Sequence, residues 1–142
     1  GWAFFYHNTC HTNVPKTNAF RVQVAKWRKL VFANNIWQGT RDGFVFWRDG
    51  PSPISMTNDI VHADSGVLLK IRKQGYGTKA AAQERLAFFS GAIVADPQLK
   101  DYRPQPDSPA IDGGVVIPGV NDESFRGKTP DIGAIEVGGK DP

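Results

Sequence analysis

The sequence predicts a mainly β fold in which short parallel strands stack as a solenoid, that is, a parallel β-helix. Strand-like segments recur about every 25 residues, and a second set of strand-like segments repeats with the same spacing. The chain is rich in turn and strand residues, with 15 Gly, 10 Pro and nine Phe. Because no long helix separates the repeats, a TIM barrel and a doubly wound sheet are excluded. A β-sandwich remains the alternative fold.

The first strand of each repeat alternates apolar and mixed residues around a polar pair. The three segments are 3–11, 30–38 and 54–62, and their polar pairs lie 27 and then 24 residues apart. Alternation of period two with one apolar side is typical of a half-buried strand. We therefore expect three apolar columns to face the interior: Ala3, Leu30 and Ile54; Phe5, Phe32 and Met56; and Thr9, Ile36 and Ile60.

An Asn-rich column marks the point where this strand should bend. It contains His7, Asn34 and Asn58, and Asn tolerates the left-handed backbone conformation. We interpret Asn8, Asn34, Asn35 and Asn58 as structural residues that satisfy the backbone of the turns. A strip that binds sugar hydroxyls or a cation is the alternative. It offers too few oxygen ligands to support calcium, so no cofactor and no metal site is predicted.

The second strand of each repeat covers 20–24, 44–47 and 67–71. Phe20 and Phe44 are 24 residues apart, and Phe44 and Leu68 are again 24 residues apart, so we expect these three residues to align. Residues typical of turns connect the two strands of each repeat.

Composition limits the other function classes. The 142 residues fit a single domain, with repeats over 1–74 and a helix and closing segment over 75–142. The sequence holds no run of eighteen apolar residues, so no membrane span is predicted. Its only cysteine is Cys10, which excludes an internal disulfide framework. A net charge of +3 is too weak to predict nucleic-acid binding.

The C-terminal half begins with a predicted helix over 79–89. Thr78 is a suitable N-cap, several Ala follow it, and Gly91 is a plausible stop. The apolar residues near the end of this helix should dock on the solenoid.

Four strings then follow in order: Ala-Asp-Pro-Gln-Leu at 95–99, Ser-Pro-Ala-Ile-Asp-Gly-Gly at 108–114, Arg126-Gly127, and Pro-Asp-Ile-Gly-Ala-Ile-Glu at 130–136. Together they resemble the C-terminal signature of secreted right-handed parallel β-helix proteins of the pectate-lyase-like superfamily. The resemblance implies a secreted, extracellular or cell-surface protein that acts on or binds an acidic polysaccharide, by lyase or hydrolase chemistry. The superfamily also includes adhesins and phage spikes, so a non-catalytic scaffold for adhesion or surface assembly is the alternative.

Charged residues of the closing segment are interpreted as structural. Asp112 and Asp131 would pair with Arg126 or accept backbone N–H bonds, which would fix an irregular segment. A catalytic acidic cluster is the alternative.

Candidate substrate-binding residues lie in the repeats. His11 and His62 share a column with Gln38 after the bend, and aromatic faces and basic groups would suit sugar rings with carboxylates. The candidates are Trp37, Trp47, Arg41, Arg48, His11 and His62, with Lys70 and Arg72 among the nearby basic residues. The alternative places the aromatics in the core and the basic residues on a solvated surface. Spacing selects no carboxylate pair, so catalytic residues are not identified.

The first repeat should expose strand edges and apolar core. We therefore expect upstream repeats, or another protein chain, to cover the N-terminal end, and we interpret the chain as a fragment of a longer β-helix.

Overall fold

The computed structural model describes residues 1–22, 27–46, 53–122 and 125–138. Within these ranges the fold is mainly β, with short strands, one α-helix and one 3-10 helix. None of the helices in the described ranges is long and apolar enough to cross a membrane.

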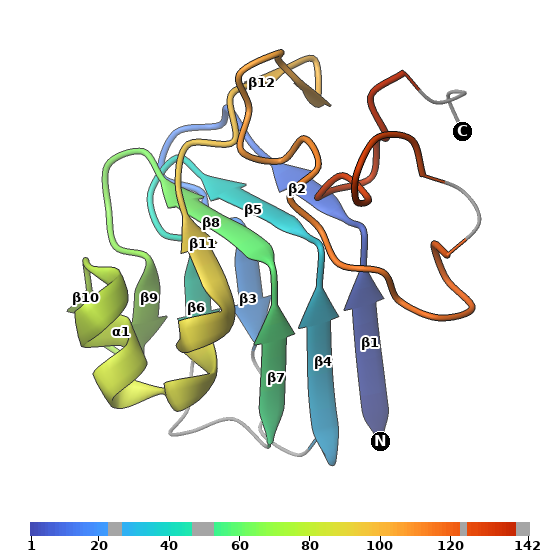
Figure 1. The fold of residues 1–142 in the computed structure, drawn as a ribbon. Coiled ribbons are helices and arrows are strands. Elements are labelled where there is room, and N and C mark those ends of the chain that lie inside the picture. The colour runs from blue at the N-terminus through green and yellow to red at the C-terminus, as the bar shows by residue number, and fades with distance from the viewer. Residues whose placement is uncertain (23–26, 47–52, 123–124, 139–142) are drawn as a thin grey trace.

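Three sheets hold the strands of the repeats, and the chain visits them in the same order three times (Figure 1). The first sheet, here sheet A, contains β1 (Trp2–Tyr6), β4 (Lys29–Ala33) and β7 (Ile54–Thr57). Sheet B contains β2 (Thr9–His11), β5 (Ile36–Gly39), β8 (Asp59–Ala63) and β11 (Ala92–Val94). Sheet C contains β3 (Phe20–Val22), β6 (Phe44–Phe46), β9 (Leu69–Ile71) and β10 (Gln74–Tyr76). All neighbours pair in parallel except β10, which is antiparallel to β9. A separate hairpin joins β12 (Leu99–Lys100) and β13 (Arg103–Pro104).

The register confirms the predicted columns of sheets A and B. Ala3 pairs with Leu30 and Leu30 with Ile54, and the Phe5 and Thr9 columns pair as expected. In sheet C the alignment of Phe20 with Phe44 is confirmed, but Phe44 pairs with Leu69. The expected alignment with Leu68 is therefore wrong by one residue. Both leucines are buried, so burial does not distinguish them. Because Lys70 points outward, its neighbour Leu69 takes the inward position in the strand.

Each bend between sheets A and B is a single left-handed residue. His7, Asn34 and Asn58 have φ of 52°, 58° and 52°, which confirms the expectation for the Asn-rich column. A left-handed residue reverses the alternation of a strand. Residues after the bend therefore face the opposite way from the prediction.

The reversal produces two apolar clusters on opposite faces of sheet B. Trp37 packs in the interior with the aromatic rings of the other sheets, whereas its neighbour Ile36 belongs to a second cluster. That cluster contains Ile60 and also Ala110 and Ile132 from the C-terminal segment. The expectation that Ile36 and Ile60 face the interior is therefore wrong. They lie on the outer face of sheet B, beneath the closing segment (Figure 1).

The interior core is dominated by aromatic rings stacked from repeat to repeat. Phe5 stacks on Phe32 with ring centroids 5.0 Å apart, and Phe20 lies 5.3 Å from Phe44. Trp37 joins the group with its ring 4.8 Å from that of Phe20. Such clusters bury large apolar area and favour tilted ring contacts.

The predicted helix divides into two parts, α1 (Lys79–Arg85) and the 3-10 helix η1 (Ala87–Gly91). Thr78 caps α1 as expected, because its hydroxyl accepts the Ala81 N–H at 3.2 Å. The break at Leu86 lets η1 press against β7: a Cβ on Gly91 would lie 1.8 Å from the Met56 carbonyl oxygen. Phe89 is fully buried there, so the expected docking on the repeats is confirmed.

Candidate anion-binding site

A hollow of about 330 Å3 lies on the outer face of sheet C and is lined mainly by basic residues. Five of its eight lining residues are Arg or Lys, and one is Asp. The lining residues are Asn18, Arg21, Arg41, Asp42, Val45, Lys70, Arg72 and Lys73. We call this hollow the basic groove.

The strand register places the middle of the basic groove. Arg21 of β3 pairs with Val45 of β6, and Val45 pairs with Lys70 of β9. Alternate residues of a strand point to opposite faces, so these three share the outer face while their neighbours fill the core. Strands in a sheet are about 4.8 Å apart, so Arg21 and Lys70 lie about 10 Å apart across the sheet.

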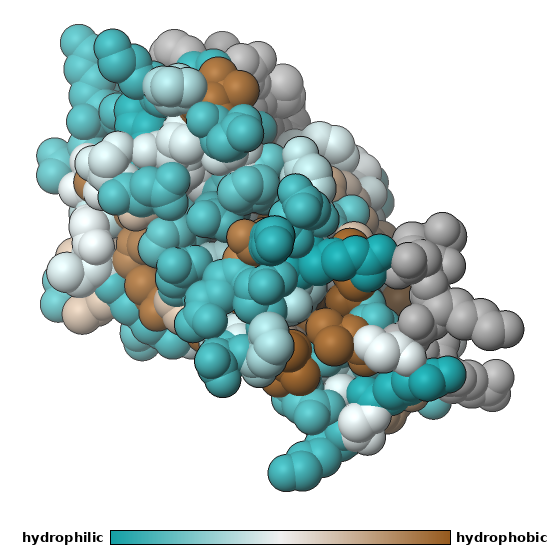
Figure 2. Space-filling model, turned by 90° about the horizontal axis from the view of Figure 1, so that it is seen from above, coloured by the Kyte–Doolittle hydropathy of each residue, from teal (hydrophilic) through white to brown (hydrophobic). Residues whose placement is uncertain are grey.

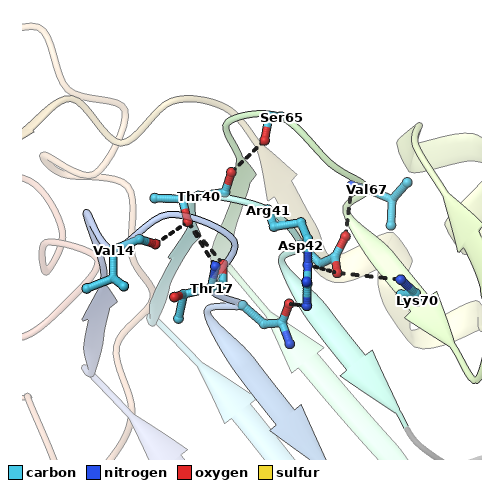
Figure 3. Close-up of polar contacts among 9 residues, drawn as sticks. Val14, Thr17, Thr40, Arg41, Asp42, Ser65, Val67 and Lys70 are labelled. Carbon is cyan, nitrogen blue, oxygen red and sulfur yellow. Dashed lines mark hydrogen bonds and ion pairs between the residues drawn. The ribbon is translucent and has the colours of Figure 1, made fainter.

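The Asp42 carboxylate organises one side of the basic groove (Figure 3). It is only 3% exposed, and its Oδ2 accepts from Arg41 Nε at 3.0 Å and lies 3.9 Å from Lys70 Nζ. Its Oδ1 accepts from the Val67 N–H at 3.4 Å. One buried carboxylate therefore orients two cations from different repeats, and its own charge is compensated.

The loops that lead into sheet C are tied together beside this carboxylate. The Thr40 hydroxyl donates to the Val14 carbonyl at 2.6 Å and accepts the Thr17 N–H at 3.0 Å. Ser65 donates to the Thr40 carbonyl at 2.7 Å. These bonds join three successive repeats (Figure 3), so the rim of the basic groove is held in place before any ligand arrives.

Among the residues that line the basic groove, Asp42 is the only carboxylate. A glycoside hydrolase needs two carboxyl groups about 5–10 Å apart, and Asp42 is already engaged by Arg41 and Lys70. The described part of the chain also holds no group of three or more His, Cys, Asp or Glu placed to bind a metal ion. The arrangement therefore suits binding of an anion better than acid–base hydrolysis.

Of the predicted substrate-binding residues that the structure describes, only Arg41 lines the basic groove. Trp37 is wrong as a ligand platform, because it is 1% exposed in the core, where its Nε1 donates to Asp59 Oδ1 at 3.1 Å. Trp47 and Arg48 lie outside the described residues. His11 and His62 are on the outer face of sheet B instead, half-buried beside Gln38.

The two histidines have local partners. His11 Nδ1 lies 3.0 Å from Gln38 Oε1, and His62 Nε2 lies 3.2 Å from Asp64 Oδ1. The edge of the His11 ring meets Tyr102 with centroids 5.5 Å apart. The view from above, over sheet B and the C-terminal segment, shows a mainly hydrophilic surface with small hydrophobic groups (Figure 2).

Sequence reasoning missed Arg21, Asp42 and Lys73 as members of the basic groove. A signal for Arg21 was present, since it is the one polar residue between Phe20 and Val22 in its strand. Aligning it with Lys70 requires the Phe44–Leu69 register, which the sequence did not reveal.

Asn8 and Asn35 form a ladder of hydrogen bonds that leads to Asp59. Asn8 donates through its backbone N–H and its Nδ2 to Asn35 Oδ1, at 2.9 and 2.8 Å. The Asn35 N–H donates in turn to Asp59 Oδ1 at 3.1 Å. Asp59 Oδ2 is buried and has no hydrogen-bond partner among the described residues, and burial raises the pKa of Asp59 to about 7. The ladder therefore ends on a buried carboxyl group whose charged form is destabilised.

The left-handed residues of the bends also hold the closing segment. Asn34 Nδ2 donates to the Val115 carbonyl at 2.7 Å, and Asn58 Nδ2 donates to the Gly113 carbonyl at 2.7 Å. His7 Nε2 lies 2.6 Å from Asn121 Nδ2, and burial lowers the pKa of His7.

The carboxylates of the closing segment accept backbone N–H groups. Asp112 Oδ1 accepts from Lys128 at 2.7 Å, while Asp131 accepts from Asp112 and Val137 at 2.8 and 2.7 Å. Arg126 is exposed and contributes its backbone N–H, which donates to Glu136 at 2.8 Å. The expected structural role of Asp112 and Asp131 is thus met through backbone bonds, and the described contacts include no ion pair of Arg126 with either.

Comparison with known proteins adds no relative. No protein-family model, no curated protein and no solved structure matches this chain.

Proposed function

We propose that this chain is part of a secreted parallel β-helix protein, and that its basic groove binds an acidic polysaccharide outside the cell. The single observation that carries the proposal is the convergence of five basic side chains, contributed by three successive repeats, on one hollow. The superfamily resemblance of the C-terminal strings supports the right-handed β-helix and the extracellular location.

The parallel β-helix is supported by the order of the strands. Sheets A, B and C each receive one strand per repeat, in parallel and in register, through three repeats. A β-sandwich does not require matching residue types at a fixed spacing, whereas a solenoid does.

An acidic polysaccharide fits the spacing and the chemistry of the basic groove. Its carboxylates repeat along the chain, as the cations do across the strands, and Arg and Lys bind carboxylates through charge-assisted hydrogen bonds. Exposed ion pairs contribute only about 0–1 kcal/mol each, so useful affinity needs several at once. A polymer can engage them together, whereas a free monosaccharide cannot.

The favoured chemistry, if the chain contributes to an enzyme, is β-elimination. A lyase must neutralise the uronate carboxylate next to the acidic proton, and basic side chains perform that task. A hydrolase is less suited, because the described residues that line the groove include no second carboxylate. Incubation with polygalacturonate, followed by ultraviolet absorbance of unsaturated products, distinguishes a lyase from a purely binding protein.

The binding test compares two double variants with the same charge change. Lys70→Gln/Lys73→Gln alters the basic groove, whereas Lys100→Gln/Lys128→Gln alters exposed residues elsewhere. Arg21 and Arg72 have further interactions of their own, so the lysines are the cleaner positions. Calorimetry with polygalacturonate should show about tenfold weaker binding for the groove variant and little change for the control.

Two outcomes contradict the proposal. Equal losses in both variants would mean that net charge, not the basic groove, attracts the polymer. Tighter binding of single-stranded DNA than of polygalacturonate at the same salt concentration would identify a nucleic-acid binder instead.

A scaffold for assembly is the second candidate function, favoured by the contrast between the two ends of the stack. β1, β2 and β3 are the edge strands of sheets A, B and C. Phe5 and Phe20 at this end are half-buried, although their counterparts Phe32 and Phe44 are fully buried. The opposite end is covered by β10 and η1. Upstream repeats or another protein chain would complete the uncovered end.

The mass of the native polypeptide and its oligomeric state test this second candidate. A mass well above 15.6 kDa would support upstream repeats, and concentration-dependent association of a 15.6 kDa chain would support a partner chain. A native chain of 15.6 kDa that stays monomeric in sedimentation would contradict both.

A further inference from the structure

A second hollow, of about 350 Å3, lies beside the basic groove and shares two residues with it. Arg72 and Lys73 line both, and the remaining lining residues are Ile71, Gln74, Tyr76 and Arg85. None of these lining residues is acidic. We call this hollow the hairpin hollow, because the β9–β10 hairpin forms most of it.

The hairpin fixes the shared cations between the two hollows. β10 runs antiparallel to β9, with Gln74 opposite Ile71, so Arg72 and Lys73 form the turn. Arg72 has a left-handed φ of 53°, and its N–H donates to the Phe46 carbonyl at 2.8 Å. The turn is thereby anchored to β6, and the two basic side chains project at the boundary of the two hollows.

The far side of the hairpin hollow carries groups suited to a sugar. Arg85, the basic residue in the last turn of α1, is exposed. Tyr76 is half-buried, with an apolar ring body and a polar tip. Gln74 is exposed and offers an amide donor and acceptor. The hollow thus combines a cation, an aromatic ring and an amide, without a competing carboxylate.

We propose that the hairpin hollow is a second subsite for the same acidic polysaccharide, so that the ligand is a polymer that leaves the basic groove at the hairpin turn and continues toward α1. This inference rests on the proposed function of the basic groove. Along the outer face, β3 and β9 are two strand spacings apart, about 10 Å. Tyr76 pairs with the inward residue Leu69, so the polymer reaches the hairpin hollow by passing round the turn at Arg72 and Lys73. A short oligosaccharide fills one hollow, whereas a longer one fills both and engages Arg85.

Binding of galacturonate oligomers of defined length tests the inference. We expect the affinity of the unaltered chain to rise when the oligomer becomes long enough to reach Arg85. In Arg85→Gln, affinity for the long oligomer should fall by up to about fivefold, toward that of the short one, because one exposed ion pair is lost and binding at linked sites is multiplicative. Affinity for the short oligomer should not change. Lys100→Gln carries the same charge change at an exposed site away from both hollows and should keep the full length dependence.

The outcomes separate the two proposals. Failure of every oligomer to bind would overturn both proposals. Loss of short-oligomer binding in Lys70→Gln would uphold the basic groove by itself, because Lys70 lines that groove and is not among the lining residues of the hairpin hollow. An unchanged length dependence in Arg85→Gln would overturn the second subsite while leaving the basic groove standing. An equal effect of Lys100→Gln would overturn it as well. Thermal unfolding of each variant establishes that the fold is retained.

Discussion

Among single residues, Asp59 is a buried carboxyl group whose charged form is disfavoured by burial. Its Oδ1 accepts three hydrogen bonds, from the Asn35 N–H, Asn35 Nδ2 and Trp37 Nε1, while its Oδ2 has none among the described residues. Burial raises its pKa from 3.8 to about 7. Between these two values the folded chain holds a proton that the unfolded chain has released. The Asp59 contribution to stability is therefore present below about pH 4 and is lost as the pH rises through about 7.

Replacing Asp59 by Asn should remove this pH dependence. The amide keeps an acceptor for Asn35 and Trp37 and continues the ladder with an uncharged group. Between pH 5 and pH 8 the unaltered chain should lose at most about 3 kcal/mol of unfolding free energy because of Asp59, and Asp59→Asn should not show this loss. Relative to the unaltered chain, the variant should therefore gain stability as the pH rises to 8. Urea unfolding at the two pH values measures this. The exposed change Asp107→Asn is the control, and a parallel pH profile for Asp59→Asn would contradict the account.

His7 should have the opposite pH dependence. Its Nε2 lies 3.1 Å from Asn34 Nδ2 and 2.6 Å from Asn121 Nδ2, so it accepts from both amides only while it is unprotonated. Its Nδ1 lies 3.3 Å from the Gly133 carbonyl oxygen and donates to it in this tautomer. Burial lowers the pKa of His7, although Glu136 and backbone carbonyls act the other way. The contribution of His7 is therefore present above pH 6.5 and is lost as the pH falls below it.

NMR titration and amide hydrogen exchange test whether His7 holds the closing segment in this way. The His7 pKa should lie below 6.5, and amides of the closing segment near Gly133 should lose protection at pH 5 in the unaltered chain. In His7→Asn, which keeps a residue that tolerates the left-handed conformation, that loss should disappear. Exchange that is equally acid-sensitive in both proteins would show that His7 does not hold the segment.

At the scale of elements, sequence periodicity predicted the strands and their pairing in sheets A and B. The bends were predicted as well, because Asn at a fixed column signals left-handed backbone. The side of the sheet to which the residues after the bend point was not predicted, because one left-handed residue reverses the alternation of the strand. Trp37 was therefore placed on the surface and Ile36 in the interior, the reverse of their positions.

The candidate site was predicted only in part for a similar reason. Arg41 follows from the clustering of basic residues with aromatics, and Lys70 and Arg72 belong to the same cluster. The contact of Lys70 with Asp42 depends on a one-residue shift between Leu68 and Leu69, which are both apolar and both buried. Periodicity cannot distinguish two equivalent leucines.

The packing of η1 on β7 gives a test at this scale. A Cβ on Gly91 would lie 1.8 Å from the Met56 carbonyl oxygen, which is backbone and cannot move aside easily. We expect Gly91→Ala to lower the free energy of unfolding by about 2 kcal/mol or more. Gly77→Ala is the matched control, because nothing lies within 4 Å of its Cβ position, and it should be neutral or slightly stabilising. Similar urea midpoints for both variants would contradict the close packing of η1.

For the whole molecule, the closing segment matters because it covers the outer face of sheet B. Ile132 is fully buried and packs with Ile36, Ile60 and Ala110 in the second cluster. The sheet is therefore apolar on both faces, and the repeats depend on a segment that follows them in the sequence. The interior cluster and the second cluster should accordingly unfold together.

Truncating Ile132 tests this dependence. We expect Ile132→Ala to lower the unfolding free energy by about 2–4 kcal/mol and to leave a single cooperative transition, because the two clusters share sheet B. Circular dichroism and Trp fluorescence, followed through the same urea titration, should give coincident curves. Two separate transitions would mean that the closing segment folds as an independent unit. The exposed change Val116→Ala is the control and should cost little.

The three edge strands at one end of the stack have a consequence for how such a protein can change its length. A duplicated repeat could pair in parallel with β1, β2 and β3, whereas β10 and η1 cover the other end of the stack. Each duplicated repeat would add one strand to sheet C and lengthen its outer face by about 4.8 Å. The length of the sheet C face that carries the basic groove is then a quantity that evolution, or an engineer, can change one repeat at a time, while β10 and η1 stay the same.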